Sequence, residues 1–150
     1  MRALNIVECA YRATLEEQDD TIVWFTRAIK NAGGDVDILL RSNAVNYGVK
    51  AQDALGLKFG AWRQTQPPRL ADDLTGAIGR GITVFLVSED LAERGLKPAD
   101  LIGGTEFIGR GEIAGLLSAT IRSGTGKQIH DTPGAGTLLD KGAARPQGHP

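Results

Sequence analysis

The fold is decided by a stretch near the middle of the chain, Gly81-Ile82-Thr83-Val84-Phe85-Leu86-Val87-Ser88-Glu89-Asp90-Leu91-Ala92-Glu93-Arg94-Gly95-Leu96. Its first part, from Ile82 to Val87, is continuously apolar and rich in β-branched residues, which is typical of a strand covered on both faces. Ser88 follows as a predicted N-cap, and residues 89–93 as a short helix. The stretch therefore predicts a central strand of a parallel sheet that leads directly into a helix.

The N-terminal part of the chain predicts a first strand–helix–strand unit. Residues 3–8 have the pattern of a short strand, and residues 35–40 that of a strand buried on both faces. Between them, Thr14-Leu15-Glu16-Glu17 fits a capping box and Gly33-Gly34 supplies a left-handed helix stop. A helix is therefore predicted over residues 14–32.

The rest of the chain continues the alternation of strands and helices. Pro67-Pro68 opens a predicted helix, because proline is tolerated in a first helical turn. A shorter strand is predicted at residues 105–108 and a last helix at residues 111–121. Residues 44–54 can be helical, whereas residues 56–62 have the pattern of a loop. The alternation predicts an α/β fold, a three-layer sandwich with a mainly parallel sheet.

The length and composition of the chain fit one domain with a tail. A chain of 150 residues has the size of a single ordinary domain. From residue 122 onward the composition changes, because nine of the last 29 residues are Gly or Pro. Such a segment cannot build its own core. We therefore predict an α/β domain over residues 1–121 and a flexible Gly/Pro-rich tail over residues 122–150.

Charge and hydropathy exclude several classes of partner. The formal net charge is −1, with acidic and basic residues interleaved, whereas nucleic-acid binding requires a clustered basic surface. No apolar run approaches the ~18 residues that can span a bilayer. The sequence begins without a secretory signal, and its one cysteine, Cys9, cannot form an intrachain disulfide. We expect a cytoplasmic protein that binds neither nucleic acid nor membrane.

Several stretches together carry a resemblance to a known family: residues 5–8 before a helix, 33–37, 43–47, 81–96 and 97–102. Over roughly residues 3–117 the chain resembles the DsrE/DsrF-like family of sulfur-relay proteins. The resemblance implies a flavodoxin-like sheet, trimers or hexamers, and a sulfur-relay partner protein. In some members it also implies sulfur carried as a persulfide on a cysteine after the third or fourth strand.

The chain departs from the family at the residues that carry this chemistry. Val87-Ser88-Glu89-Asp90 stands where thiols are expected. Sulfur transfer needs a thiolate, which none of these residues supplies. Cys9 is the remaining candidate catalytic thiol, at the end of the first strand, where open α/β sheets place their ligand crevice. The alternative is that Cys9 is a small buried hydrophobic residue.

Polar residues that follow the predicted strands are candidate ligand-binding residues, because the same ends of parallel strands meet at one edge of a sheet. For most of them the alternative is turn formation, helix capping or a favourable place near a helix N-terminus. In a thiolate site at Cys9, a nearby carboxylate would disfavour the charged sulfur and a nearby arginine would favour it. The candidates are Glu8, Arg12, Asn43, Asn46, Tyr47, Ser88 and Asp90.

Aromatic residues in the middle of the chain predict self-association. Trp62 could cover a pocket as a lid or anchor a contact between subunits, and we favour the contact. Phe59 and Tyr47 add to the aromatic surface that we expect there. With the family resemblance, this predicts a homotrimer or hexamer, with a dimer as the alternative.

The sequence indicates no cofactor and no metal site. Residues 109–114 formally match a dinucleotide fingerprint, but they lie near the end of the chain rather than in a first strand–helix–strand unit. Residues 123–127 resemble part of a phosphate loop without a preceding strand. The histidines, His130 and His149, have no cysteine or carboxylate cluster at ligand spacing.

Three functions remain open from the sequence. The first is a non-catalytic DsrE-like protein that binds a small ligand or a sulfur-metabolism partner at the edge where the strands end. The second is a sulfurtransferase or sulfur carrier that uses Cys9. The third is an inactive structural subunit of a mixed DsrE-type oligomer.

Overall fold

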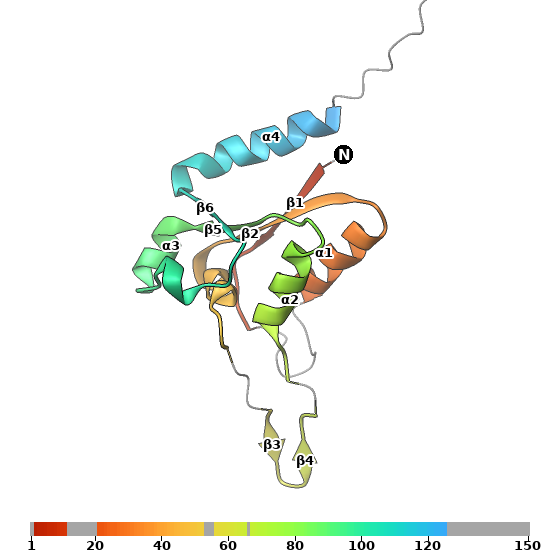
Figure 1. Ribbon diagram of the computed structural model, residues 1–150, viewed down its shortest axis with the longest axis vertical. Coiled ribbons are helices and arrows are strands. Elements are labelled where there is room, and N and C mark those ends of the chain that lie inside the picture. The colour runs from red at the N-terminus through yellow and green to blue at the C-terminus, as the bar shows by residue number, and fades with distance from the viewer. Residues whose placement is uncertain (1, 12–20, 53–55, 66, 126–150) are drawn as a thin grey trace, which may run out of the picture.

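The computed structural model describes residues 2–11, 21–52, 56–65 and 67–125, and its centre is a four-stranded parallel sheet (Figure 1). The strands lie in the order β1 (Arg2–Val7), β2 (Asp35–Leu40), β5 (Val84–Val87) and β6 (Glu106–Ile108). Their register places Val7, Leu40, Leu86 and Phe107 in one row across the sheet.

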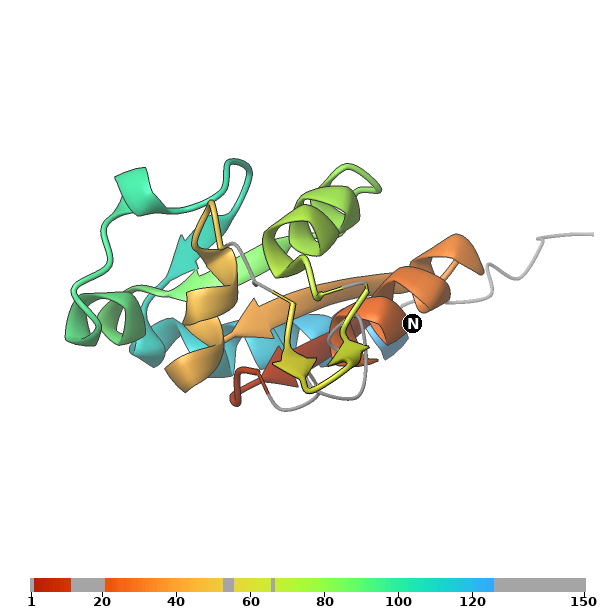
Figure 2. The ribbon, with the colours of Figure 1, turned by 90° about the horizontal axis from the view of Figure 1, so that it is seen from below.

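Helices cover both faces of this sheet. The α-helices α1 (Thr21–Asn31) and α2 (Leu70–Ile78) lie on one face, together with the 3-10 helix η1 (Ser42–Gly48). Helix α4 (Ile113–Thr125) covers the other face, above the strands in Figure 1 and behind them in Figure 2. The predicted three-layer α/β sandwich with a mainly parallel sheet is confirmed.

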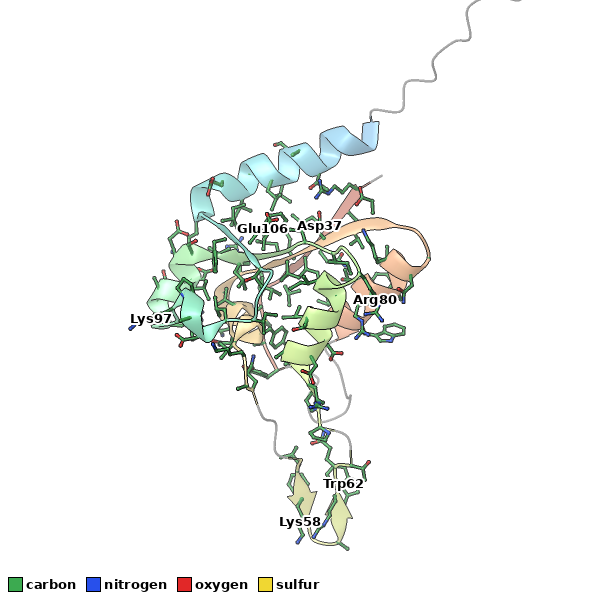
Figure 3. All side chains as sticks on the ribbon, in the orientation of Figure 1. Asp37, Lys58, Trp62, Arg80, Lys97 and Glu106 are labelled. Carbon is green, nitrogen blue, oxygen red and sulfur yellow. The ribbon has the colours of Figure 1, made fainter. Side chains whose placement is uncertain are left out.

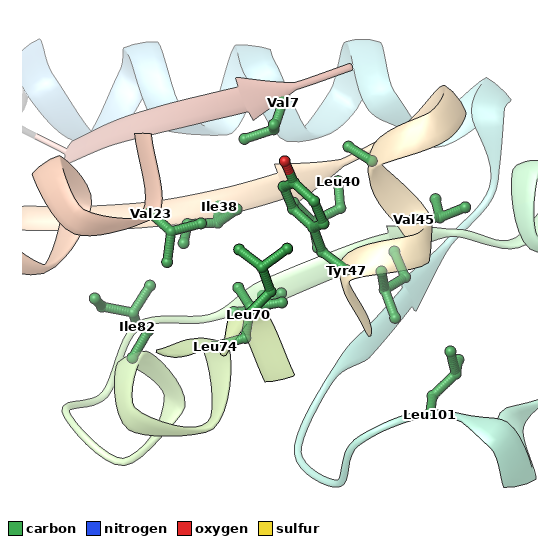
Figure 4. Packing of buried hydrophobic residues seen from close by; sticks show 14 of the residues in the cluster. Val7, Val23, Ile38, Leu40, Val45, Tyr47, Leu70, Leu74, Ile82 and Leu101 are labelled. Carbon is green, nitrogen blue, oxygen red and sulfur yellow. The ribbon is translucent and has the colours of Figure 1, made fainter. Parts of the chain in front are cut away.

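The alternation of side chains along β2 and β5 divides the core into two clusters. Because neighbouring residues of a strand point to opposite faces, Ile38 and Leu40 pack toward α1 and α2, whereas Leu39 packs toward α4. This two-sided burial explains the continuous apolar runs of both strands. Figure 4 shows the larger cluster, which includes Val7, Val23, Ile38, Leu40, Val45, Tyr47, Leu70, Leu74, Ile82 and Leu101.

A buried carboxylate connects β2 to its two neighbours, β1 and the residue that precedes β5. Asp37 of β2, which is labelled in Figure 3, accepts the backbone N–H of Thr83 at 2.9 Å and the side chain of Arg2 from β1, with Nε at 2.8 Å. The carboxylate is therefore satisfied on both oxygens, as a buried charge must be.

The segment predicted as a loop contains a β-hairpin, so that prediction is wrong. Strands β3 (Lys58–Phe59) and β4 (Trp62–Arg63) pair antiparallel and project from the body of the molecule (Figure 1). Gly60 at the turn has a φ of +57°, which glycine adopts without strain. A two-residue turn that opens with glycine is a common hairpin connection.

Several boundaries also differ from those predicted. A helix was predicted as possible over residues 44–54, but the 3-10 helix η1 ends at Gly48, and residues 53 and 54 lie outside the described residues. Helix α3 (Ser88–Glu93) already includes Ser88, and its N-cap is Val87, so the prediction of a Ser88 cap is wrong. The short 3-10 helices η2 (Pro98–Asp100) and η3 (Arg110–Glu112) were not predicted. The predicted helix start at Thr14 and residues 126–150 of the predicted tail lie outside the described residues. Residues 122–125, which were also predicted as tail, belong to helix α4, so the predicted boundary at residue 121 is too early.

Candidate functional site

All four strands end at the same edge of the sheet, and this edge holds most of the candidate residues. Cys9 follows β1, and Ser42 and Asn43 follow β2. Ser88 begins the helix after β5, and Arg110 lies two residues after β6. The parallel arrangement therefore brings together residues from four distant parts of the sequence, and candidate residues were predicted in three of them.

Asp90 is the buried centre of this edge. Its side chain is 6% exposed, and one carboxylate oxygen accepts the backbone N–H of Ser42. The other accepts the side chain of Arg110, with Nε at 3.0 Å. Burial alone would raise the pKa of Asp90, but the hydrogen bonds from Ser42 and Arg110 outweigh it and hold the pKa below its ordinary value. Asp90 is thus an ionised residue whose acceptors are used within the chain.

The residues around Asp90 extend this network. Arg110 also pairs with Glu93 at 2.6 Å, and its backbone N–H donates to Glu89 at 2.9 Å. The carboxylates of Asp90 and Glu93 raise the pKa of the Arg110 guanidinium, with the hydrogen bond to Asp90 as the largest cause. Arg94 donates to the side-chain oxygen of Asn43 at 2.7 Å. Asn43, Glu89 and Asp90 therefore hold the turns together, in agreement with their interpretation as structural residues.

Cys9 is an exposed cysteine, so the prediction of a small buried residue is wrong. Cys9 lies beyond the end of β1. There the backbone of β1 is bonded to the turn after β2, because the Arg41 N–H donates to the Val7 carbonyl oxygen at 3.0 Å. The carboxylate of Glu8 pairs with the Arg41 guanidinium at 3.4 Å. Arg12, the other predicted neighbour of the thiol, lies outside the described residues.

Tyr47 is a core residue, and the prediction that it adds to an aromatic surface is wrong. Its side chain is 1% exposed, because η1 turns Ala44, Val45 and Tyr47 toward the sheet. The Tyr47 hydroxyl accepts the backbone N–H of Tyr11 at 2.7 Å. Asn46 is half-buried, and its backbone carbonyl accepts Gln52 Nε2 at 2.6 Å.

Sequence analysis missed the two residues that organise this edge, Arg110 and Ser42. Arg110 stood inside a glycine motif interpreted only for its resemblance to a nucleotide site. Ser42 has a φ of +52°, a left-handed conformation that costs a serine energy and that its bond to Asp90 helps to hold. No local pattern of the sequence marks that conformation.

The geometry of this edge favours a binding surface over a deep crevice for a small ligand. Open α/β sheets place ligand crevices where the strand order reverses, whereas the four described strands follow one another in sequence order. Within the described residues, no group of three or more His, Cys, Asp or Glu could hold a metal ion. No helix in the same part of the chain is long and apolar enough to cross a membrane.

Comparison with known proteins identifies the fold. No protein-family model matches the sequence, and no curated protein matches it significantly. Among solved structures, YchN from E. coli matches 80% of this chain and 95% of its own, with 18% identity and a TM-score of 0.59. MTH1491 from Methanobacterium thermoautotrophicum, a protein of unknown function, matches 79% of this chain and 92% of its own, with 16% identity and a TM-score of 0.56. YchN has a DsrE-like fold, and so this chain has a DsrE-like fold.

Proposed function

We propose that this protein is a non-catalytic member of the DsrE-like group that binds a partner from sulfur metabolism at the edge where its strands end. The observation that carries the proposal is the turn between β5 and α3. In the family this turn supplies the reactive thiol, and here it holds Ser88, Glu89 and Asp90. Asp90 is buried and bonded to Ser42 and Arg110.

The chemistry of the turn supports binding without sulfur transfer. A sulfane sulfur is accepted and passed on by a polarisable thiolate, and a hydroxyl such as that of the exposed Ser88 cannot replace it. Arg110 pairs with the carboxylates of Asp90 and Glu93, and Arg94 donates to the side-chain oxygen of Asn43. The turn therefore acts as a rigid support for the surface rather than as a reaction centre.

A protein partner fits this edge better than a small molecule. The described strands show no reversal of order, and so they lack the usual position of a small-ligand crevice. Exposed groups at the edge include Cys9, which follows β1, and Ser88, which follows β5, and β2 lies between these two strands in the sheet. We further propose that the protein associates with itself as a trimer or hexamer, for which its exposed aromatic residues provide contact surface.

One observation favours a second function, that of a sulfur carrier. Cys9 is exposed at the end of β1, and an accessible thiol is the first requirement for a persulfide. In this alternative Cys9 would replace the missing family cysteine from a different strand.

Mass spectrometry distinguishes the two functions. The reduced full-length protein is incubated with inorganic polysulfide, separated from the excess reagent, and measured intact next to a Cys9→Ser variant. Non-catalytic binding predicts that wild type and variant carry the same mass additions, with no persulfide localised to Cys9. A stable addition of one sulfur atom that maps to Cys9 and disappears in the variant would establish the sulfur carrier instead.

A further inference from the structure

The aromatic residues of this protein lie mostly on its surface. The sequence contains two Trp and four Phe residues, and five of these six are exposed: Trp24, Phe25, Phe59, Trp62 and Phe107. The only aromatic residue in the buried core of the described part of the chain is Tyr47. Large aromatic side chains normally supply much of the apolar area that a core buries. Their exposure here points to a surface that another molecule covers.

Four of the five exposed residues form two adjacent pairs. The first pair stands on the hairpin, where Phe59 lies opposite Trp62 with ring centroids 5.9 Å apart. Phe59 is 64% exposed and Trp62 is 50% exposed. Because side chains alternate between the faces of a strand, Lys58 and Arg63 form a second cross-strand pair on the opposite face. The hairpin thus has an aromatic face and a basic face.

In the described part of the chain, the hairpin also stands apart from the sheet and its helices. Figure 1 shows β3 and β4 beyond the sheet and the helices that cover it. A two-stranded hairpin by itself is marginally stable in water. Covering its aromatic face would therefore stabilise the hairpin as well as remove apolar surface from water.

The second pair stands on α1, in the body of the molecule. Trp24 is 55% exposed and Phe25 is 52% exposed, while Val23 and Thr26 of the same helix face the sheet and are fully buried. The outer side of α1 is therefore apolar where a surface helix is normally polar. Both tryptophans of the chain belong to these two pairs, one to each.

We propose that the hairpin of one copy docks through Phe59 and Trp62 onto the α1 face of a second copy, formed by Trp24 and Phe25. This inference rests on the proposed self-association and names the surfaces that produce it. The two surfaces differ, so the contact is head-to-tail, and a rotation that closes it gives a ring of defined size. Trp and other aromatic residues are enriched in such contacts and dominate their energy.

Charge favours a second copy as the occupant. Residues 56–65, which contain the hairpin, carry Lys58 and Arg63 and no acidic residue, for a formal charge of +2. The whole chain carries −1, so all other residues together carry −3. The net charges of the arm and of all other residues are therefore opposite, which favours the encounter of two copies, and association should slow as ionic strength rises. Helix α1 itself carries Arg27 and Lys30 and no acidic residue, so this attraction comes from the rest of the body.

Tryptophan fluorescence provides the first test, since each surface contains one tryptophan. Full-length Trp24→Phe retains only Trp62, and Trp62→Phe retains only Trp24, while each substitution keeps an aromatic ring at the contact. On dilution we expect the emission of both variants to shift to longer wavelength over the same concentration range in which light scattering shows loss of the larger species. Emission that stays constant while the larger species dissociates would overturn the proposed contact.

Disruption of each surface provides the second test, with the isolated exposed aromatic Phe107 as a matched control. Phe59→Ser combined with Trp62→Ser, and Trp24→Ser combined with Phe25→Ser, should each remove the larger species that wild type and Phe107→Ser retain. If wild type forms an oligomer and both double variants do too, the surfaces are wrong and self-association stands. If wild type is a monomer, self-association fails as well, and binding of that monomer to anionic phospholipid vesicles would assign the hairpin to a lipid surface instead.

A crosslink between copies tests the contact without removing any aromatic residue. In a Cys9→Ser background, one variant carries Ala61→Cys at the hairpin turn and another carries Ala28→Cys, one helical turn from Trp24. Mixing the two under mild oxidation should give more disulfide-linked dimer than mixing Ala61→Cys with an Ala99→Cys control on η2. Equal amounts of dimer in the two mixtures would contradict the docking.

Discussion

The carboxylate of Asp90 accepts the backbone N–H of Ser42, and this bond ties the turn after β2 to the first turn of α3. Ser42 adopts a left-handed conformation with a φ of +52°. For a residue with a side chain this conformation costs about 1–2 kcal/mol. The bond to a buried charge offsets that cost. Arg110 bonds to the other oxygen of Asp90, so the same carboxylate also holds the turn after β6.

Replacement of the Asp90 carboxylate should therefore destabilise the fold. We expect Asp90→Asn to lower the free energy of unfolding by about 2 kcal/mol, because charged hydrogen bonds to a buried group are lost. Urea denaturation measures the change. The control Asp72→Asn alters an exposed ion pair with Arg69 and should change stability by less than about 0.5 kcal/mol. Equal effects of the two substitutions would contradict a structural role of Asp90.

The same residue predicts a pH dependence. Hydrogen bonds hold the pKa of Asp90 below its ordinary value despite burial, so its contribution to stability is complete above the unfolded pKa of about 4 and is lost as pH falls through the folded pKa. The difference in unfolding free energy between wild type and Asp90→Asn should stay constant between about pH 7 and pH 5 and narrow below about pH 4. If the difference in unfolding free energy widens on acidification, the pKa of Asp90 is raised rather than lowered by folding, and the prediction is wrong.

Two adjacent glycines before β6 should respond differently to the same substitution. Gly104 has a φ of +85°, and a Cβ atom there would lie 2.9 Å from Ile78 Cγ2. Gly103 has open space around it and no left-handed conformation. We expect Gly104→Ala to reduce the free energy of unfolding by more than about 1 kcal/mol and so to lower the thermal midpoint. Gly103→Ala should leave the midpoint unchanged or raise it slightly. Similar midpoints would be inconsistent with the backbone described here.

Tyr47 should behave as a core residue with one useful hydroxyl. Tyr47→Phe keeps the buried ring and removes the acceptor of the Tyr11 N–H, so it should cost about 1 kcal/mol of unfolding free energy. Tyr47→Ala should cost about 3–5 kcal/mol, because it empties a filled position in the core. Denaturant unfolding of both variants measures these costs. A Tyr47→Ala variant of near wild-type stability would contradict the burial of Tyr47 in the core.

The parts of the fold that were predicted from the sequence have long and regular patterns. Strand β2 follows its predicted bounds, because residues 36–40 are all buried and their side chains fill both faces of the sheet. The end of α1 agrees with the Gly33-Gly34 stop within one residue. The hairpin was missed because strands of two residues are too short to show alternation, although Gly60 between two aromatic residues was a usable turn signal.

The location of the candidate site at the ends of the strands could be predicted from the sequence, but the contacts between its residues could not. The rule that parallel strands end at one edge brought Cys9, Asn43 and Asp90 to the same side of the sheet. Exposure of Cys9 and burial of Tyr47 depend on how the chain turns after each strand, which local sequence does not determine. The pairing of Asp90 with Arg110 joins residues 20 positions apart and appears only once the strands are placed.

The central claim, that this protein does not transfer sulfur although it has a DsrE-like fold, is tested most directly by its reaction with cyanide. Protein treated with polysulfide and freed of excess reagent is mixed with cyanide, which removes a persulfide sulfur as thiocyanate and leaves the thiol. We predict that wild type and Cys9→Ser release the same background amount of thiocyanate. Release of about one equivalent per chain from wild type, abolished by Cys9→Ser, would contradict the claim and make Cys9 a sulfur carrier.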